Sequence, residues 1–423
     1  MSIKNLIQDI EIKKLKEEYN NNKELLEIVS EYIKEKKLIL YGGYALNLIL
    51  PDNIKIYKDY TQADYDCYSY DARKHIIQLG KKLKKLKYKL IKVKLAKHEN
   101  TFKLYVGTLN VLDLTQLDKS LFDIMIKIHL YEKYEGLIKY YKDNYNIVPL
   151  YLLKRNMHYE LARPYESYYR WEKIESRLKL LTKVYFNKEF RKKRLYCENP
   201  NKKTYHKTPE DLKHCLSLLL NYVKENKNPI IDSLAIKLLK NIKNKDCCRL
   251  NKLTYLLMIL STNYKSDCNN TIKIIKKNIN LDKYELIIRD VTDSSSSVDI
   301  LKDRTRIALF DKINNVRYNL LTIIKVKDNC FSIMKKGEYI VGTVDTILCY
   351  LYSFYLSYFV CKYKDYRHNS VLEDTQQYID LYENYIKSLD TLKRYNTECY
   401  GKQLSKQDIY EKLWKKKLSI LKI

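Results

Sequence analysis

The amino-acid sequence predicts a helix-rich α/β protein with mixed sheets, built as two successive domains. The chain has 423 residues, a length that corresponds to two or three domains. Only 8 glycines and 6 prolines are present, too few for a loop-rich β-sandwich. Helical and strand-like hydrophobic patterns alternate along both halves. Since 45% of the residues are hydrophobic, packed cores can form.

The first half is expected to hold a small mixed α/β unit between helical segments. Helical periodicity covers residues 3–36, and a short apolar strand, Leu38–Tyr41, follows it. After a glycine pair comes a helix over Tyr44–Leu50, which a proline ends. Strand patterns at 63–69, 88–95, 102–106 and 109–115 surround a lysine-rich helix near 71–86. Helical periodicity returns over residues 120–190.

A polar, basic stretch at residues 187–209 holds two of the six prolines and predicts a linker. We therefore expect a first domain over residues 1–186, including the N-terminal helix, and a second over 210–423. In the second half, helices over 209–278 precede strands at 284–289, 305–310, 319–326 and 330–334, and helices return from residue 343 to the end. This order repeats that of the first half, without its glycine pair.

The charge of the chain points to a polyanionic partner. Lys and Arg number 80 against 51 Asp and Glu, a formal net charge of +29. Heavy use of Lys, Asn, Ile and Tyr is also typical of an AT-rich genome, which explains part of the lysine excess. The remainder repels itself unless an anion binds, so nucleic acid or an anionic surface is favoured over a small-molecule substrate alone.

The sequence predicts neither export nor a membrane anchor. Its first twenty residues are charged throughout, unlike a signal peptide. The longest uncharged apolar run, Thr346–Cys361, is too short and too polar to span a bilayer and predicts a buried helix. The ten cysteines form no CxxC pair and no zinc-like spacing, so we expect reduced thiols in a cytoplasmic protein.

Two glycines and three aspartates form the most informative motif. Gly42 and Gly43 stand between a strand and a helix, where glycine lets the backbone approach a phosphate at the helix N-terminus. Asp64 and Asp66, two apart in a strand, face the same way, and Asp113 lies in a later apolar strand. Either part alone is usually structural, but their order along the chain favours a functional site.

Three converging carboxylates need a counter-ion to remain ionised together. Their hard oxygen ligands suit Mg²⁺ or Mn²⁺. Two such ions about 4 Å apart can hold the attacking and leaving oxygens of a phosphoryl displacement. The motif therefore predicts metal-dependent phosphoryl transfer.

The segments GGYALN, DYDCYS and VLDL resemble those of the polymerase-beta-like nucleotidyltransferases. Within that superfamily they are most similar to the poly(A) polymerase catalytic subunits of large nucleocytoplasmic DNA viruses. The later segments ELARP, YRWEK, TVDTIL, KRY and CYGKQ agree, so the resemblance covers residues 35 to 415. It implies a nucleotidyltransferase domain followed by a second, degenerate nucleotidyltransferase-like domain.

The resemblance implies a template-independent polynucleotide adenylyltransferase that adds AMP from ATP to RNA 3′ ends in mRNA polyadenylation. Asp64 and Asp66 would hold two Mg²⁺ or Mn²⁺ ions, and Asp113 would hold the one that lowers the pKa of the primer 3′-hydroxyl. The glycine pair and Ser69 would contact the nucleotide phosphates. Many superfamily members carry Ser or Thr directly after the glycines, where this chain has Tyr44.

Three cations further along the chain are candidate phosphate ligands. Arg170, Lys173 and Arg177 are spaced to share one helical face. They could grip the ATP triphosphate or the RNA backbone. The alternative is a solvated helix face on which Glu172 and Glu175 pair with them.

Two other functions stay open: a nucleotidyltransferase acting on another RNA end, a small molecule or a protein, and a non-catalytic RNA-binding subunit. Viral relatives act either with a helper subunit or as self-associated dimers. The apolar strands and aromatic tail of the second half favour a homodimer. A viral protein of this kind is expected in the host cytoplasm or the virion.

Overall fold

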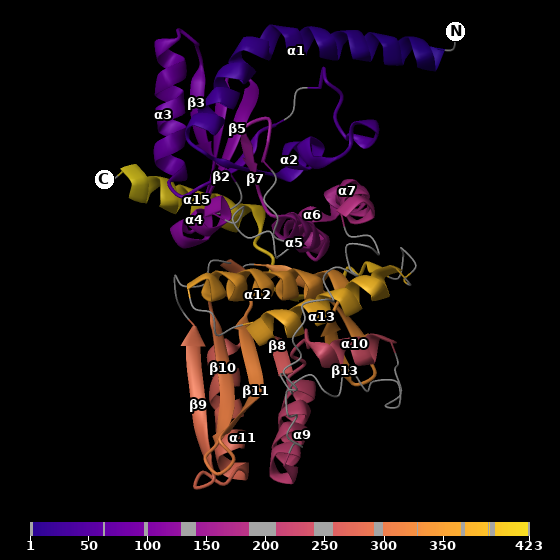
Figure 1. The fold of residues 1–423 in the computed structure, drawn as a ribbon, viewed down its shortest axis with the longest axis vertical. Helices are drawn as coiled ribbons and strands as arrows, with labels where there is room; N and C mark the ends of the chain where they lie inside the picture. Colours follow the sequence, from indigo (N-terminus) through magenta and orange to yellow (C-terminus); the bar gives the residue numbers. More distant parts are fainter. Residues whose placement is uncertain are drawn as a thin grey trace. The chain divides into compact units, whose positions relative to one another are not determined.

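A computed structural model divides the chain into two compact units (Figure 1). Unit 1 comprises Met1–Leu153, Lys179–Leu195 and Lys406–Ile423, and unit 2 comprises Lys154–Leu178 and Tyr196–Ser405. The structure describes residues 3–61, 64–96, 100–127, 141–185, 209–240, 257–291, 299–327, 329–364, 369–387, 389 and 394–421. Apart from residue 209, the expected linker at 187–209 lies outside the described residues.

Unit 1 is built around a mixed sheet with the strand order β3-β4-β5-β2-β1-β7-β6. Strand β2 runs antiparallel to β1 and parallel to β5, and β3, β4 and β5 form antiparallel pairs. Its elements are α1 (Ile3–Glu35), β1 (Ile39–Tyr41), α2 (Gly42–Ile49), β2 (Asp66–Ser69), α3 (Ala72–Lys85), β3 (Ile91–Leu95), β4 (Thr101–Val106), β5 (Leu109–Gln116), α4 (Lys119–Lys127), β6 (Tyr141–Lys142), β7 (Tyr145–Ile147) and α15 (Lys406–Leu421). The helices and strands expected between residues 3 and 115 are confirmed.

Helix α3 covers one face of this sheet. Asp71 caps its N-terminus by accepting a hydrogen bond from the Lys74 amide, and lysines occupy its last turn, where they complement the helix dipole. Its apolar stripe is buried, and Gly80 lies against Ile91 of β3 and Leu104 of β4. The residues that alternate with Ile91 and Leu104 therefore point to the opposite face of the sheet.

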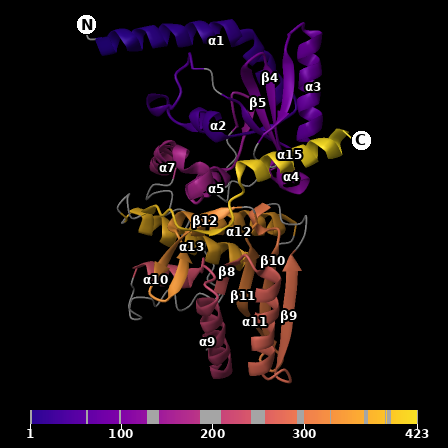
Figure 2. The same ribbon diagram turned by 180° about the vertical axis from the view of Figure 1, so that it is seen from behind.

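Unit 2 holds a four-stranded sheet, β8-β11-β10-β9, and a three-stranded sheet, β13-β12-β14 (Figure 2). Its elements are α6 (Pro164–Ser167), α9 (Glu210–Glu225), α10 (Ser233–Lys240), β8 (Leu257–Ser261), α11 (Tyr264–Asn278), β9 (Tyr284–Val291), β10 (Arg304–Asp311), β11 (Val316–Lys325), β12 (Cys330–Lys336), β13 (Tyr339–Gly342), α12 (Val344–Lys364), α13 (Asn369–Lys387) and β14 (Cys399–Gly401). Helices α5 (Leu150–Leu161) and α7 (Trp171–Tyr185) cross the boundary between the units.

Unit 2 repeats the topology of unit 1 element by element. Strand β8 runs parallel to β11, and β11, β10 and β9 form antiparallel pairs. In unit 1, strands β2, β5, β4 and β3 pair in the same order and with the same directions. Helix α11 follows β8 as α3 follows β2. Ile230 forms an antiparallel bridge to β8 where β1 pairs with β2. Even the helix ends match, since Lys37 after α1 and Lys227 after α9 both have positive φ angles.

The register shows what the copy has lost. Asp66 and Asp113 are paired across β2 and β5, whereas the equivalent pair across β8 and β11 is Met258 and Thr322. A methionine and a threonine cannot supply carboxylate oxygens. The sequence prediction of a second, degenerate nucleotidyltransferase-like domain is therefore confirmed.

The unit boundary differs from the expected one at residue 186, because residues 154–178 pack with unit 2. Lys154 of α5 forms a buried ion pair with Glu383 of α13. One turn along, the Nδ1 atom of His158 lies 2.7 Å from a carboxylate oxygen of Asp345 in α12. Arg394 donates to both oxygens of Asp345, at 2.7 and 2.8 Å. A charge buried away from water is stable only when it is paired. These pairs therefore hold the C-terminal part of α5 to unit 2.

Four strands lie where the sequence predicts helix. Strand β8 is the apolar run LMILS, buried at every position, and such a run does not distinguish a buried strand from a buried helix. The short hairpin β6–β7 interrupts the helical stretch predicted at 120–190, and β14 interrupts the C-terminal helical tail. The turn at Gly337 creates β13 beside β12. Within the expected buried helix, residues 350–356 are buried.

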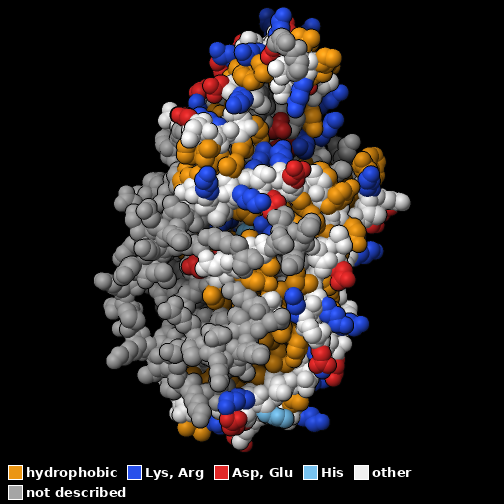
Figure 3. Space-filling view, turned by 90° about the vertical axis from the view of Figure 1, so that its right-hand side faces the viewer, with side chains coloured by type: hydrophobic (Ala, Val, Ile, Leu, Met, Phe, Trp, Pro, Cys, Tyr) orange, Lys and Arg blue, Asp and Glu red, His pale blue; other side chains and the backbone are white. Residues whose placement is uncertain are grey.

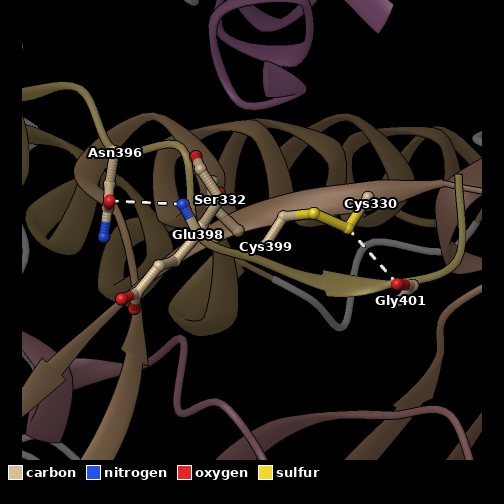
Figure 4. Close-up of a disulfide and its surroundings, with 7 residues drawn as sticks. Cys330, Ser332, Asn396, Glu398, Cys399 and Gly401 are labelled. Atoms are coloured by element: carbon tan, nitrogen blue, oxygen red, sulfur yellow. Dashed lines mark hydrogen bonds between the residues drawn. A yellow bond between two sulfur atoms is a disulfide. The ribbon is translucent and has the colours of Figure 1, made fainter. Parts of the chain in front are cut away.

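A disulfide joins Cys330 of β12 to Cys399 of β14, with 5.3 Å between the Cα atoms (Figure 4). The prediction that all ten cysteines are reduced is therefore wrong for this pair. Sequence spacing could not reveal it, because 69 residues separate the two cysteines and only the pairing of β12 with β14 brings them together. Cys67, Cys215 and Cys268 are buried free thiols. No helix in the described part of the chain is long and apolar enough to cross a membrane.

Candidate active site

The turn from β1 into α2 brings the backbone against a carboxylate of β2. Gly42 has a φ angle of +72°, in the left-handed region that favours glycine. A Cβ atom at Gly42 would lie 3.1 Å from Cγ of Asp66 and closer still to its Oδ2. Glycine is thus required twice over, by the backbone angle and by the close approach of Asp66. The amides at the N-terminus of α2 begin at this point.

Asp66 and Asp113 lie side by side on one face of the sheet. Asp66 is the register partner of Tyr41 in β1 and of Asp113 in β5. Residues opposed in this way point to the same face, with neighbouring strands about 4.8 Å apart. Burial raises the pKa of the Tyr41 phenol, and the charges of Asp66 and Asp113 raise it further. The two carboxylates therefore form one electrostatic cluster.

Asp64 completes the predicted motif at the start of β2. It lies two residues before Asp66 in the segment that leads into the strand, and its side chain is exposed. The carbonyl of Tyr65 between them accepts a hydrogen bond from the Asp113 amide, which ties this segment to β5. Asp64 is placed for access from solvent, and Asp66 and Asp113 are partly buried beside it.

Lys103 of β4 is a further candidate site residue, which no motif in the sequence indicates. It is the register partner of Asp113, and its ammonium group forms an ion pair with Oδ2 of that residue. Asn110 donates to the other oxygen, Oδ1, at 2.8 Å. Burial lowers the pKa of Lys103, but Asp113 outweighs this and the net shift is upward. The turn at Gly107 pairs Tyr105 with Asn110, and a β-bulge then shifts the register by one residue, so that Lys103 lies opposite Asp113 and not Leu112. Counting from the turn in the sequence would therefore have missed this pair.

The oxygen ligands of this cluster fit a divalent cation. As placed, the described residues include no group of three His, Cys, Asp or Glu side chains arranged around a common point. Asp66 and Asp113 nevertheless offer neighbouring carboxylate oxygens, and Asp113 already attracts the Lys103 cation. Hard oxygen donors are the ligands that Mg²⁺ and Mn²⁺ prefer. An ion bound between these groups would share Asp113 with the Lys103 ammonium.

The remaining predicted residues lie elsewhere. Ser69 is fully buried at the other end of β2, where its hydroxyl lies 2.7 Å from Nδ1 of His75 and accepts from the Asp71 amide. It supports the start of α3 and is not beside Gly42. Tyr44 packs edge-on against the Tyr65 ring, with 5.0 Å between the centroids, so it belongs to an aromatic cluster.

Arg170, Lys173 and Arg177 belong to unit 2. Arg170 donates to Glu160 at 3.3 Å, an ion pair that agrees in part with the solvated-helix interpretation. Lys173 is exposed and Arg177 is half-buried on α7. The aspartates of the motif belong to unit 1.

A mixed sheet with a strand–glycine–helix turn and in-register aspartates defines a nucleotidyltransferase fold. The crystal structure of the Megavirus polyadenylate synthase has this fold: it matches 99% of this chain and 82% of its own, with a TM-score of 0.71 and 17% sequence identity. Residues 27–167, which include Gly42, Asp66 and Asp113, match the family model described as "Poly(A) polymerase catalytic subunit". Over this segment, the chain is similar to that family.

A putative poly(A) polymerase catalytic subunit of Acanthamoeba polyphaga mimivirus is 27% identical to this chain over 229 residues. The match covers 52% of this chain and 36% of the mimivirus protein, so the chain spans about a third of that relative's length. The similarity to the poly(A) polymerase family is thus greatest over the segment that carries the glycine turn and the aspartates.

Proposed function

We propose that this protein is a template-independent polynucleotide adenylyltransferase that transfers AMP from ATP to RNA 3′ ends. The observation that carries the proposal is the close approach of Gly42 to Asp66, with Asp113 in register beside it, inside the segment that matches the poly(A) polymerase family. In the reaction, the 3′-hydroxyl oxygen bonds to the α-phosphorus, the bond to the β-phosphate oxygen breaks, and pyrophosphate leaves with the hydroxyl proton lost to solvent.

The chain's own residues supply positions and charges for this step. Asp64, Asp66 and Asp113 would hold Mg²⁺ or Mn²⁺, which when bound supplies positive charge to the reacting phosphate and lowers the pKa of the 3′-hydroxyl. Gly42, with Gly43, lets the N-terminus of α2 face the nucleotide phosphates without a side chain in between. Before a metal ion binds, Lys103 would neutralise the charge of Asp113.

Other parts of the proposal depend on the polyanionic substrate. The charge of +29 supports RNA as the acceptor. Arg170, Lys173 and Arg177 are proposed as further phosphate contacts. A homodimer, or alternatively a complex with a viral helper subunit, and a location in the host cytoplasm or virion remain part of this proposal. Transfer to another RNA end or a small molecule, and RNA binding without catalysis, are the alternatives that the assay separates.

The test is nucleotide addition to an oligo(A) or U-containing RNA primer, with each nucleoside triphosphate supplied separately and with Mg²⁺ or Mn²⁺. We expect the protein to use ATP in preference to the other nucleoside triphosphates. Asp66→Asn and Asp113→Asn should each reduce the rate by a hundredfold or more, which is roughly 3 kcal/mol of transition-state stabilisation, and leave RNA binding largely intact. Asp123→Asn, on α4 of the same unit, is the matched control. Near-wild-type extension by either site variant would refute the assignment.

A further inference from the structure

A row of one tyrosine and four charged side chains runs across five strands of the unit 1 sheet. From Tyr41 on β1 it passes through Asp66 and Asp113, and the register continues through Lys103 on β4 to Lys94 on β3. Directly opposed residues share a face, so all five side chains lie on the face away from α3. The carboxylates occupy the middle of the sheet and the lysines its β3 edge.

Two further residues extend the basic end of this row. Lys92 is two residues from Lys94 on β3 and shares its face, and its register partner is Tyr105 of β4. The Lys94 ammonium lies over the Tyr105 ring, 4.8 Å from its centroid. Lys92 and Lys94 are exposed, and Tyr105 is half-buried between them and Lys103. We call Lys92, Lys94, Lys103 and Tyr105 the hairpin track.

The positive charge of the hairpin track exceeds what the carboxylates neutralise. Lys103 pairs with Asp113, but among the residues that the structure describes, no Asp or Glu forms an ion pair with Lys92 or Lys94. In unit 2, the register equivalents of Lys94 and Lys103 are Arg289 and Arg306, although the carboxylates are absent there. Cations therefore occupy the same register positions in both units. Figure 3 shows one face on which Lys and Arg side chains spread over unit 1 with a few acidic side chains among them.

We propose that the hairpin track binds the RNA backbone just upstream of the 3′ end. The inference rests on the proposed function, because it takes Asp66 and Asp113 as the place where the terminal hydroxyl reacts. Three strand spacings separate Lys94 from Asp66, about 14 Å, which is room for a short stretch of single strand. Lysines contact phosphates without reading sequence, and an interleaved aromatic ring offers a stacking surface that every base can use.

The first test is RNA binding by the full-length variant Lys92→Gln/Lys94→Gln, measured by fluorescence anisotropy with a labelled single-stranded oligonucleotide at several salt concentrations. Each lost phosphate contact lowers the salt slope for a single strand by about 0.7, so two contacts lower it by about 1.4. At 0.1 M salt this corresponds to an affinity loss of about 25-fold. Both lysines are exposed on an edge strand, so the variant is expected to fold.

The matched control is Lys81→Gln/Lys84→Gln. These lysines are equally exposed on α3, which covers the other face of the same sheet. This control removes the same charge and should leave the slope within about 0.3 of the wild-type value. Equal losses in both double variants would show a general charge effect and overturn the hairpin track.

A second measurement separates the RNA from the triphosphate. The KM for ATP, measured at saturating primer, should be unchanged in Lys92→Gln/Lys94→Gln, whereas the KM for primer should rise with the dissociation constant. A rise confined to the KM for ATP would assign the lysines to the triphosphate and refute the proposal. Nucleotide addition by the wild-type chain is scored in the same experiment. If the wild-type chain adds no nucleotide, the proposed function is refuted. If the wild-type chain adds AMP and Lys92→Gln/Lys94→Gln binds RNA as tightly as the wild type, only the hairpin track is refuted.

Discussion

Replacing Gly42 with alanine should damage the proposed active site far more than it damages the fold. Two effects are introduced together. The φ angle of +72° is left-handed, and an L-residue with a Cβ atom pays roughly 1–2 kcal/mol there. The new methyl group would also overlap Oδ2 of Asp66, which must move by roughly 1 Å to restore van der Waals contact.

Gly107 separates these two effects. It has nearly the same backbone angle, φ +62°, in the turn between β4 and β5 of the same unit, but a Cβ atom there would meet nothing within 4 Å. Gly107→Ala therefore introduces the backbone strain without displacing a carboxylate. Both variants should lose roughly 1–2 kcal/mol of unfolding free energy in urea titrations.

Only Gly42→Ala should lose activity. A displacement of about 1 Å at a reacting centre costs on the order of a hundredfold in rate. The assay is single-turnover AMP addition to a saturating RNA primer at a temperature where both variants are folded. Equal rates for the two variants would refute the reasoning, because the contact of Gly42 with Asp66 would then have no catalytic consequence. A similar loss in Gly107→Ala would refute it too.

Three further predictions concern unit 2. Burial raises the pKa of the Asp345 carboxyl, but Arg394 outweighs this and holds the pKa well below its usual range. The pair therefore stabilises the fold above about pH 4, and this stabilisation is lost as the pH falls further. Arg394→Met should cost about 3–5 kcal/mol at pH 7 in urea unfolding, and an unchanged stability would contradict the buried pair. Reducing the Cys330–Cys399 disulfide should lower the unfolding free energy by about 4 kcal/mol, as expected for a loop of this length, and an identical Tm with and without reductant would exclude the crosslink. Burial raises the pKa of Asp232 to about 7, so the folded state holds the Asp232 proton more tightly than the unfolded state does. The free energy of unfolding should therefore fall as the pH rises from about 4 to 7. Asp232→Asn should remove that fall, and an unaltered pH profile of the variant would refute this prediction.

Local patterns in the sequence were enough to predict the elements around the site. The run Ala63–Ser69, the lysine-rich helix after it and the strands to residue 115 each have the period of the structure that they form, and their boundaries agree within a few residues with β2, α3, β4 and β5. The glycine pair and the aspartates were identified as a motif because strand alternation and turn chemistry are properties of neighbouring residues. These features depend on contacts within about ten residues, so the sequence contains them directly.

The register across strands could be known only from the tertiary structure. Whether Asp113 lies opposite Asp66, and Lys103 opposite Asp113, depends on which strands pair and at which residue, and a shift by one would turn these side chains to the other face. For the same reason Ser69, a plausible phosphate ligand by proximity in sequence, proved to be buried against His75 at the far end of its strand.

The second half shows the same division most clearly. Its helical and strand patterns predict a similar order of elements, but they predict helix at β8, because a strand buried on both faces has no alternation. Only the pairing of β8 with β11 showed that unit 2 repeats unit 1 and placed Met258 and Thr322 where unit 1 has its carboxylates. The pairing of β12 with β14 brought Cys330 to Cys399. Composition, periodicity and spacing thus determined the class of fold and the reactive motif. Strand pairing, which joins residues far apart in the chain, decided that Asp66 and Asp113 lie in register and which lysine lies beside them.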